Sequence, residues 1–421
     1  MNAFCAIISG GEFAPLDGIE NAACVIACDR GYEYAARCGI KPDLLLGDFD
    51  SYTGALPAGV HCARDYGRLA QCSLPAPVYQ YLAGGSAEGV TAVSNRTSLD
   101  RLSICPRILR DVTDGSTRLQ LAGRDLPHPL MLAPVAYQGL VNPRGEADTA
   151  RAAAAVDACM VASTLSSCTL EDIAAAASGP KWFQLYVQPR KDVTLDLLQR
   201  AEAAGYASIV VTLDAAIQLP GHAALRGGFR LPAECVAANL RGCPQIDAPG
   251  DPRGGRRIFR DVMRGAPTWA DLDWLRSSTG LPVWVKGVLH PDDAVRLRDA
   301  GVDGLVVSNH GGRALDHAPA SLAMLPSIRA AVGPAFPLLF DSGIRSGTDV
   351  YKAIALGADA VLIGRLQVYA LAIAGALGVA HMLRLLCEEL EVCMALTGCS
   401  SLDEIRRAGC VRLAAREEDA C

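Results

Sequence analysis

The sequence predicts an α/β protein whose main part is a closed (β/α)8 barrel, known as a TIM barrel, with a small α/β appendage at the N-terminus. Two observations support the barrel. From residue 129 onward, short apolar runs rich in β-branched residues alternate with stretches of helical period, which is typical of βα units around a parallel sheet. Nearly every apolar run also ends in a polar residue, as expected where barrel strands open onto a site.

The apolar runs match the eight strands that close a barrel of this type. They lie at residues 129–136, 158–163, 182–187, 208–214, 282–288, 304–309, 337–343 and 360–365. Helices are predicted between them at 147–156, 170–177, 195–204, 270–277, 292–300, 322–332 and 348–356. Several of these stretches end in Ala-Gly or Leu-Gly, and glycine suits a helix end because it tolerates a positive φ.

Length and composition indicate a globular protein that binds a small molecule. The chain of 421 residues is longer than one average domain, and a barrel with an appendage accounts for it. Half of the residues are apolar and 20% are charged, which favours a large buried core over disorder. The net charge of -6 and the absence of a Lys/Arg cluster with interleaved aromatics argue against a nucleic-acid partner.

Three features bear on the cellular location and on metal binding. Residues 1–10 lack the basic start and long apolar stretch of a signal peptide, so a cytoplasmic protein is expected. The longest apolar run, 368–380, is shorter than the roughly 20 residues of a membrane span, so we expect a buried helix. The 16 cysteines show no CxxC or Cys/His ligand spacing, which favours free, mostly buried thiols over disulfides or a metal site.

Residues able to carry chemistry gather at the predicted strand ends, which share one rim of a barrel. They are Gln184, Tyr186, Thr212, Asp214, Lys286, Ser308, His310, Asp341, Arg345, Gly364 and Arg365. One such residue could occur by chance, whereas a ring of them predicts an active site at this rim.

The segment SNHGGR, residues 308–313, contains a candidate base and a candidate anion ligand. His310 can take a proton near neutral pH if a carboxylate holds its tautomer, and Asp214 at the end of strand four could reach it. Arg313 follows two glycines that allow close approach of a ligand, and its guanidinium suits a substrate carboxylate. The alternatives are a loop histidine bonded to backbone and an arginine in a surface salt bridge.

The last strands suggest a site for a phosphorylated cofactor. Lys286 ends an apolar strand, where an ammonium group is costly unless it faces an anion such as a reduced flavin. The alternative is a lysine that reaches solvent along its aliphatic stem.

The stretches DSGIR, 341–345, and IGR, 363–365, suit the phosphate site that barrels commonly build from glycine N–H groups at the last two strands.

Over residues 63–404, nine stretches with matching order and spacing resemble one known family. They are LPAPVYQYLAGG, CPRILRDV, MLAPVA, FQLYV, VTLDA, VKGV, SNHGGRALD, DSGIRSGTDVYKAIALGADAV and IGR. The chain thereby resembles the FMN-dependent 2-hydroxy-acid oxidases and dehydrogenases, which include glycolate oxidase, lactate oxidase and mandelate dehydrogenase. The resemblance implies oxidation of an L-2-hydroxy acid to a 2-oxo acid, with electrons passed to O₂ or to a quinone or cytochrome, in a homotetramer.

The resemblance also assigns roles to residues. His310 would be the base, Asp214 its partner and Arg313 the carboxylate ligand, with Tyr186 and Tyr81 hydrogen-bonded to the substrate hydroxyl and carboxylate. The flavin ring would be held by Pro134, Val135, Ala136, Ser163, Gln184, Thr212, Lys286 and Ser308, the ribityl chain by Asp341, and the phosphate by Gly343, Arg345, Gly364 and Arg365.

Two positions depart from the family pattern. Family members commonly carry a second arginine shortly after the strand-four aspartate, and Gly221 aligns with it here. The substrate carboxylate would then rest on Arg313 alone, or His222 or Arg226 would substitute. Leu165 stands where glycolate oxidase has a tryptophan, which indicates a differently shaped pocket. A flavin-binding protein with impaired turnover is therefore an alternative to an active enzyme.

The connection between strands four and five, residues 230–268, is rich in Pro, Gly and Arg. Such a long loop in a compact domain usually has a function. We expect it to cover the active site.

Residues 1–60 are predicted to form an appendage distinct from the barrel domain of residues 63–421. Strands are expected at 5–9, 25–28 and 44–47 and a helix at 32–38. The motifs ISGGEF, ACDRGY and GIKPDLLLGDFDS resemble the start of thiamine pyrophosphokinase, which implies Mg²⁺-binding roles for Asp29, Asp48 and Asp50. The resemblance stops at Ser51, so a fusion fragment is expected rather than a transferase, and the favoured interpretation of the aspartates is that they belong to solvated turns.

Overall fold

The structure of the protein is a computed structural model that describes residues 5–8, 24–28, 35, 40, 44–46, 66–218, 220–243, 258–259, 263–409 and 411–413. Eight parallel strands close a barrel in which neighbours in the chain pair in order and β7 pairs with β14. The strands are β7 (Leu130–Leu132), β8 (Cys159–Ser163), β9 (Lys181–Leu185), β10 (Ile209–Thr212), β11 (Val283–Val288), β12 (Gly304–Val307), β13 (Leu338–Phe340) and β14 (Ala360–Ile363). The predicted TIM barrel is confirmed, and each strand falls on one of the predicted runs.

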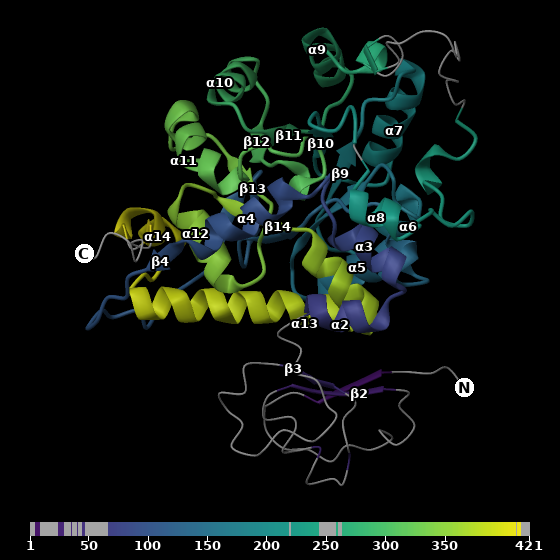
Figure 1. The fold of residues 1–421 in the computed structure, drawn as a ribbon. Helices are drawn as coiled ribbons and strands as arrows, with labels where there is room; N and C mark the ends of the chain where they lie inside the picture. Colours follow the sequence, from purple (N-terminus) through teal and green to yellow (C-terminus); the bar gives the residue numbers. More distant parts are fainter. Residues whose placement is uncertain are drawn as a thin grey trace.

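Helices surround the barrel strands and pack on their outer side (Figure 1). Those predicted from the sequence correspond to α5 (Gly145–Ala155), α6 (Leu170–Ala176), α7 (Lys191–Ala203), α9 (Trp269–Ser277), α10 (Pro291–Asp299), α11 (Ser321–Val332) and α12 (Gly347–Ala355). Side-chain caps fix several starts: Ser346 and Asp349 form a capping box at α12, and Thr268 and Asp271 form one at α9.

Further elements flank the barrel. Before it come α2 (Tyr66–Ser73), α3 (Ala76–Ala83) and α4 (Val90–Asp100), and β4 (Leu102–Ile104) pairs with β15 (Val411–Leu413) after α14 (Leu402–Ala408). The hairpin of β5 (Leu119–Leu121) and β6 (Arg124–Leu126) places Leu121 and Leu126 in the same cluster as the inward side chains of the barrel. This hairpin therefore closes one end of the barrel core.

Strand alternation decides which side chains point into the barrel. One buried cluster contains inward residues such as Val210, Trp284, Val306 and Leu339, whereas the residues directly after them pack with the helices in a second cluster. With a period of two, the next inward positions along these strands are Thr212, Lys286, Ser308 and Asp341. The strand pattern thus directs the predicted cofactor residues to the interior at the carboxyl rim.

The centre of the barrel depends on one glycine. The rings of Trp182 and Trp284 lie 4.8 Å apart between their centroids. A Cβ atom on Gly304 would lie 2.2 Å from a ring atom of Trp284, far inside van der Waals contact. Gly304 is therefore the residue that lets the indole of Trp284 fill the core beside β12.

The final long helix is longer than the sequence predicts. Helix α13 (Arg365–Thr397) has 33 residues and bends at Ala374 and Gly375, where the backbone leaves the helical region. The helix continues beyond the apolar run because the Leu, Arg, Glu and Met residues that follow are strong helix formers. Among the described residues it is long and apolar enough to span a membrane, and 39% of its apolar 18-residue stretch is buried inside the protein. Its packing against α2, α5 and α12 is that of an outer-layer helix (Figure 1).

The N-terminal region contains a parallel sheet of β1 (Cys5–Ile8), β2 (Cys24–Cys28) and β3 (Leu44–Leu46), in that order. Ile8, Val25 and Ala35 form a small buried cluster of their own. The three predicted strands are confirmed. The predicted helix, apart from Ala35, and Asp29, Asp48 and Asp50 lie outside the described residues, so the proposed ion-binding role stays a prediction.

The cysteines that the structure describes are free thiols. Cys159, Cys235 and Cys399 are buried, whereas Cys72 and Cys105 are exposed. Among the described residues there is no group of three or more His, Cys, Asp or Glu side chains arranged to hold a metal ion.

Candidate active site

A cavity opens at the carboxyl ends of the barrel strands and holds about 1100 Å³ together with its mouth. Most predicted site residues line it: Tyr81, Pro134, Val135, Ala136, Ser163, Tyr186, Lys286, His310, Arg313, Asp341, Gly343, Arg345, Gly364 and Arg365. Asp214, Gln184, Thr212 and Ser308 lie behind that lining.

His310 and Asp214 form a pair at the edge of the cavity. Nδ1 of His310 lies 3.0 Å from Oδ1 of Asp214, so the carboxylate holds the proton on Nδ1 and leaves the Nε2 lone pair for a ligand. Burial raises the pKa of Asp214, but the charges of Lys286 and His310 outweigh burial and keep that pKa below its ordinary value. Asp214 is therefore an anion that can stabilise a protonated imidazole.

The backbone around His310 is left-handed. His310 has a φ of 60°, and Gly311 and Gly312 follow with φ of 65° and 76°. A Cβ atom on Gly312 would lie 2.5 Å from the backbone nitrogen of Ala92, so glycine is required for this close approach. Asn309 accepts a hydrogen bond from the Gly312 amide and holds the turn. A strained conformation kept by surrounding contacts is typical of functional sites.

Tyr186 and Gln218 lie next to the free face of His310. The Tyr186 hydroxyl lies 3.4 Å from Nε2 of His310, and burial raises the pKa of Tyr186 to about 12, so the phenol keeps its proton. The Gln218 amide nitrogen lies 3.4 Å from the Tyr186 hydroxyl and 3.4 Å from Nε2 of His310. Gln218 was not predicted from the sequence, although its position four residues after Asp214 in a rim loop could have indicated it.

Arg313 is oriented by the last turn of α3 and by Gly84, which follows that helix. Its Nη1 donates hydrogen bonds to the carbonyl oxygens of Tyr81, at 2.8 Å, and Gly84, at 3.2 Å. The guanidinium lies 4.9 Å from the centre of the Tyr81 ring, which stacks on Phe229 at 4.2 Å. Within the described residues these contacts replace the surface salt bridge considered as an alternative, and they leave Arg313 facing the cavity.

Lys286 is buried rather than turned to solvent, which excludes the solvent-reaching alternative. Its side chain is 4% exposed and its ammonium lies 3.1 Å from Asp341 and 2.8 Å from the Ser308 hydroxyl. Burial lowers the pKa of Lys286, but Asp341 and Asp214 outweigh burial and raise that pKa above its ordinary value. A fixed positive charge therefore faces the cavity floor.

Arg345 and Arg365 bring further positive charge to the ends of β13 and β14. Arg365 donates hydrogen bonds to the carbonyl oxygens of Leu82, Gly311 and Gly84. Burial, together with the charges of Arg313 and Arg345, lowers the pKa of Arg365 to about 10. Burial likewise lowers the pKa of Arg345. The positive charge gathered at these strand ends forms a place where an anion such as a phosphate is stabilised.

Two buried side chains show that the barrel floor suits a polar ligand. The Nε2 atom of Gln184 and the Oγ1 atom of Thr212 are buried without a hydrogen-bond partner among the described residues. Orphaned polar atoms are rare in folded proteins and indicate a missing partner. The inward strand ends of β9 and β10 therefore fit the polar ring of a flavin, with Lys286 beside them and the arginines at the phosphate end.

The structure places His222 and Arg226, the two candidate substitutes for the missing second arginine, outside the lining of the cavity. Both contact Glu88, at 2.7 Å and 3.3 Å. Gly221 instead allows close packing of two loops: its Cβ would lie 2.4 Å from the Gly85 carbonyl oxygen, and the amide of His222 donates to Ala87. Neither His222 nor Arg226 takes the place of a second carboxylate ligand.

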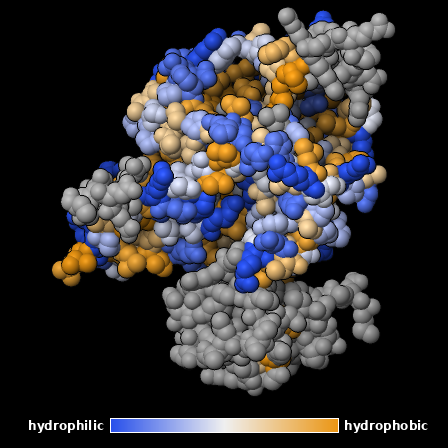
Figure 2. All heavy atoms as spheres, viewed as in Figure 1, coloured by the Kyte–Doolittle hydropathy of each residue, from blue (hydrophilic) through white to orange (hydrophobic). Residues whose placement is uncertain are grey.

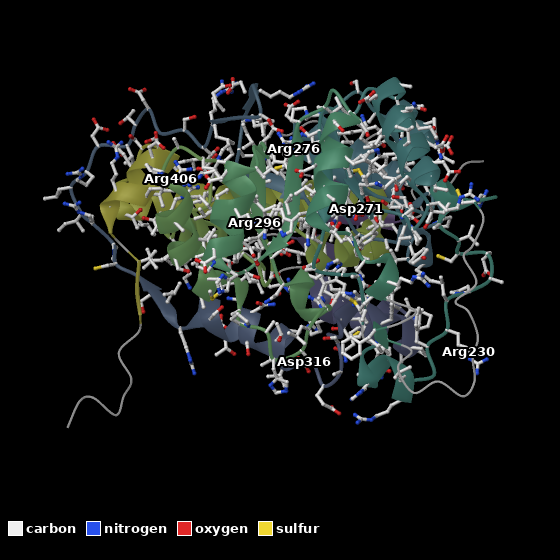
Figure 3. All side chains as sticks on the ribbon, turned by 90° about the horizontal axis from the view of Figure 1, so that it is seen from above. Arg230, Asp271, Arg276, Arg296, Asp316 and Arg406 are labelled. Carbon is white, nitrogen blue, oxygen red and sulfur yellow. The ribbon has the colours of Figure 1, made fainter. Side chains whose placement is uncertain are left out.

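Asp316 fastens the segment between α3 and α4 to the loop that carries His310 (Figure 3). Its carboxylate accepts hydrogen bonds from the backbone amides of Glu88, Gly89 and Thr91 at the start of α4. The amide of Ser86 donates to the Gly312 carbonyl oxygen in the same region. These bonds keep Tyr81 and Arg313 on the same side of the cavity.

The lining also bears on the predictions for the loops. Leu165 lines the cavity, as its departure from the family pattern suggested, and so does Tyr137, which the sequence analysis missed. From the predicted cover at 230–268, Ala238 and Asn239 pack against the loop after β8. Residues 244–257 and 260–262 lie outside the described residues, so the covering role stays a prediction.

Comparisons with known proteins agree with this geometry. A family model described as FMN-dependent dehydrogenase matches residues 70–412. The chain belongs to this family. It is therefore a flavoprotein oxidoreductase of the 2-hydroxy-acid oxidase type. The family match begins after the N-terminal motifs, which it does not cover.

Individual relatives of this FMN-dependent dehydrogenase include characterised oxidases. An L-lactate oxidase of Alicycliphilus denitrificans is 61% identical over 83% of this chain and 96% of its own length. A 4-hydroxymandelate oxidase of Amycolatopsis orientalis is 45% identical over 82% of this chain and 96% of its own length. The crystal structure of mandelate oxidase with (S)-2-phenylpropionate has a TM-score of 0.74 at 43% identity, covering 82% of this chain and 96% of that chain.

Proposed function

We propose that this enzyme oxidises a small L-2-hydroxy acid, with L-lactate as the preferred substrate, and passes the electrons to O₂. The observation that carries the proposal is the His310–Asp214 pair, which opens onto the same cavity as Arg313. The high identity to an L-lactate oxidase supports the choice of acid and of acceptor.

In the proposed reaction, Nε2 of His310 takes a proton from the substrate while Asp214 stabilises the resulting imidazolium charge. Tyr186, which stays protonated, donates its hydroxyl hydrogen to the substrate hydroxyl oxygen. The substrate loses two electrons and two protons in total and becomes the 2-oxo acid. Which of the two protons His310 removes first is outside the proposal.

Arg313 and Tyr81 are proposed to bind the substrate carboxylate. The bonds of Arg313 to the Tyr81 and Gly84 carbonyl oxygens fix the plane of its guanidinium. A fixed plane orients a bound carboxylate so that C2 of the substrate faces the barrel floor. Binding energy at the carboxylate thereby holds the reacting carbon in place.

FMN is proposed to be held by Gln184, Thr212 and Lys286 at the ring, by Asp341 at the ribityl chain, and by Arg345 and Arg365 at the phosphate. When bound, FMN supplies the two-electron acceptor that the protein itself lacks. Lys286 would supply a positive charge to stabilise a reduced, anionic ring, and the buried Ser308 hydroxyl holds that lysine in place.

The decisive experiment mixes the yellow protein anaerobically with a panel of L-2-hydroxy acids and then admits air. We expect L-lactate to bleach the flavin absorbance fastest, and air to restore the colour with formation of hydrogen peroxide. Colour that returns only with a quinone or cytochrome would replace O₂ as the acceptor. A flavin that no hydroxy acid bleaches would indicate a flavin-binding protein without turnover.

The substitution His310→Gln tests the base. We expect the variant to bind FMN but to lose bleaching by hydroxy acids, because glutamine cannot accept the proton. Bleaching at the wild-type rate would overturn the assignment.

We further propose that the enzyme forms a homo-oligomer. Ile108 and Leu109, on the segment between β4 and β5, are 82% and 98% exposed. The face of the molecule drawn in Figure 2 mixes polar and apolar residues. Such exposed apolar side chains favour burial against another chain. Light scattering of the purified protein measures the assembly.

A further inference from the structure

Helix α4 packs against two loops that the proposed function needs. The catalytic loop, residues 308–313, carries the proposed base, and the phosphate loop, residues 343–346, is proposed to bind the FMN phosphate. A Cβ atom on Gly312 would lie 2.5 Å from a backbone atom of α4, and one on Gly343 would lie 2.9 Å from another. Both loops therefore approach the backbone of this helix more closely than a larger residue would allow.

Asn95 is joined to the catalytic loop by a reciprocal pair of amide hydrogen bonds. Its Nδ2 atom donates to Oδ1 of Asn309 at 2.8 Å, and Nδ2 of Asn309 donates to Oδ1 of Asn95 at 2.7 Å. The two residues are only 3% and 2% exposed. Loss of either amide would consequently leave buried polar atoms unpaired, which is costly.

Backbone partners decide which way the two amides face. Oδ1 of Asn309 also accepts from the Gly312 amide, and its Nδ2 also donates to the Pro319 carbonyl oxygen, both at 3.0 Å. A further backbone amide donates to Oδ1 of Asn95. The reverse orientation would set N–H against N–H and oxygen against oxygen, so it is excluded. The pair thus fixes the left-handed turn that contains His310.

Arg96, the next residue of α4, contacts the phosphate loop instead. Its Nη1 atom donates to the Gly343 carbonyl oxygen at 2.9 Å, and two of its nitrogens lie 2.6 Å and 2.8 Å from the carboxylate of Asp349. That carboxylate is buried and accepts hydrogen bonds from the backbone amides of Arg345 and Ser346. Arg96 therefore holds Asp349, and Asp349 holds the backbone of the phosphate loop.

We propose that Asn95 and Arg96 are positioning residues, of which Asn95 sets the catalytic loop for the chemical step and Arg96 sets the phosphate loop for FMN binding. Neighbouring positions on an α-helix point about 100° apart, so each side chain can serve one loop. The proposal rests on the proposed function. It goes beyond that function because it assigns roles to two residues that do not line the cavity.

The substitution Asn95→Leu keeps the branched shape of the side chain but removes both bonds of the amide pair. We expect anaerobic flavin reduction at saturating hydroxy acid to slow by about 10-fold or more, because a small displacement of a catalytic group has a large effect on rate. Asn95→Ser, whose side chain is too short to form the pair, gives the same test if the leucine variant does not fold. Val93→Ala, at a position of α4 that is 67% exposed, is the control.

The substitution Arg96→Gln leaves the buried carboxylate of Asp349 without its cation. We expect the Kd of FMN to rise by about 10-fold or more, through the loss of charge-assisted hydrogen bonds that hold the phosphate loop. Fluorescence of the flavin released on dilution of the holoenzyme measures this Kd. Arg101→Gln removes an exposed charge just after the same helix and is the matched control.

A comparison of the two constants separates positioning from a general loss of stability. The rate of reduction of the FMN-saturated enzyme should fall more in Asn95→Leu than in Arg96→Gln, and the Kd of FMN should rise more in Arg96→Gln than in Asn95→Leu. Hydrogen exchange of the holoenzymes, followed by mass spectrometry, reports the loops without turnover. Exchange should become faster at residues 308–313 in Asn95→Leu and at residues 343–346 in Arg96→Gln.

Each result decides one part of the proposal. A wild-type rate of flavin reduction in the Asn95 variants would overturn the role of Asn95, and a wild-type Kd of FMN in Arg96→Gln would overturn that of Arg96. Equal changes of both constants in both variants would contradict the division of roles. A wild-type flavin that no hydroxy acid bleaches would overturn the proposed function instead, and the exchange rates would still test the two contacts.

Discussion

One carboxylate oxygen of Asp214 lies 3.0 Å from Nδ1 of His310, and its other oxygen is buried without a hydrogen-bond partner among the described residues. A buried carboxylate with one free oxygen is costly unless positive charge faces it. Lys286 provides that charge and helps to keep the pKa of Asp214 low. The anion is thus maintained for the moment at which His310 becomes positively charged.

Replacing Asp214 by asparagine should therefore slow the chemical step more than it affects cofactor binding. The asparagine side chain has the same size but no charge to stabilise an imidazolium, so we expect anaerobic flavin reduction to slow by about 100-fold or more. Stopped-flow absorbance measures the rate, and the flavin content of the purified variant measures FMN binding. Asp196→Asn, on the exposed face of α7, is the control. A rate within a factor of two of wild type would contradict the role of Asp214.

The substitution Lys286→Met should destabilise the barrel. Methionine has a similar length but leaves the buried carboxylate of Asp341 without its 3.1 Å partner. Loss of one member of a buried ion pair costs about 3–5 kcal/mol. Urea unfolding of the FMN-free protein, followed by circular dichroism, measures this free energy. An unchanged midpoint would contradict a stabilising role of this ion pair.

The same lysine predicts the response of stability to alkaline pH. The folded-state pKa of Lys286 lies above its ordinary value of 10.5, so the folded state holds the proton more tightly than the unfolded state. The stability that this group contributes is complete below pH 10.5 and is lost as pH rises through the folded-state pKa. Urea midpoints should consequently show a loss above that pH in the wild type that is smaller in Lys286→Met. Identical profiles would contradict the raised pKa.

Strand periodicity explains why many residues of the candidate site could be predicted from the sequence. Once the apolar runs are recognised as strands, a period of two directs Thr212, Lys286, Ser308 and Asp341 inward, one step beyond the buried side chains of the core. Parallel strands then bring these ends to one rim. The inward placement of these residues at the rim could therefore be predicted from local pattern and fold class together.

Contacts between loops could not be predicted in this way. The orientation of Arg313 depends on the carbonyl oxygens of Tyr81 and Gly84, more than two hundred residues earlier in the chain. Gln218 and Tyr137 reach the cavity because their loops fold over the rim. The full length of α13 was not predicted because this helix continues through charged residues after the apolar run has ended. Each depends on tertiary packing or helix propensity rather than on hydrophobic period.

The contact at Gly221 predicts the effect of a single methyl group. A Cβ at this position would lie 2.4 Å from the Gly85 carbonyl oxygen, so Gly221→Ala should push the loop of α8 (His222–Arg226) away from the segment after α3. We expect a destabilisation of about 1–3 kcal/mol and a higher KM, because the segment that orients Arg313 moves. Gly280→Ala, where a Cβ meets no atom within 4 Å, is the matched control. Equal unfolding midpoints for the two variants would contradict the close contact.

The size of the side chain at position 165 should determine which 2-hydroxy acids fit the cavity. Its side chain lines the cavity together with Tyr186 and Gln218, so a larger residue there reduces the space for the substituent on C2 of the substrate. We expect Leu165→Trp to lower kcat/KM for mandelate by at least about 10-fold relative to that for lactate, because the methyl group of lactate needs little room. Leu165→Ala should shift the preference the other way. Steady-state oxygen consumption with both acids measures the ratio, and a ratio that neither substitution changes would place the substituent elsewhere in the cavity.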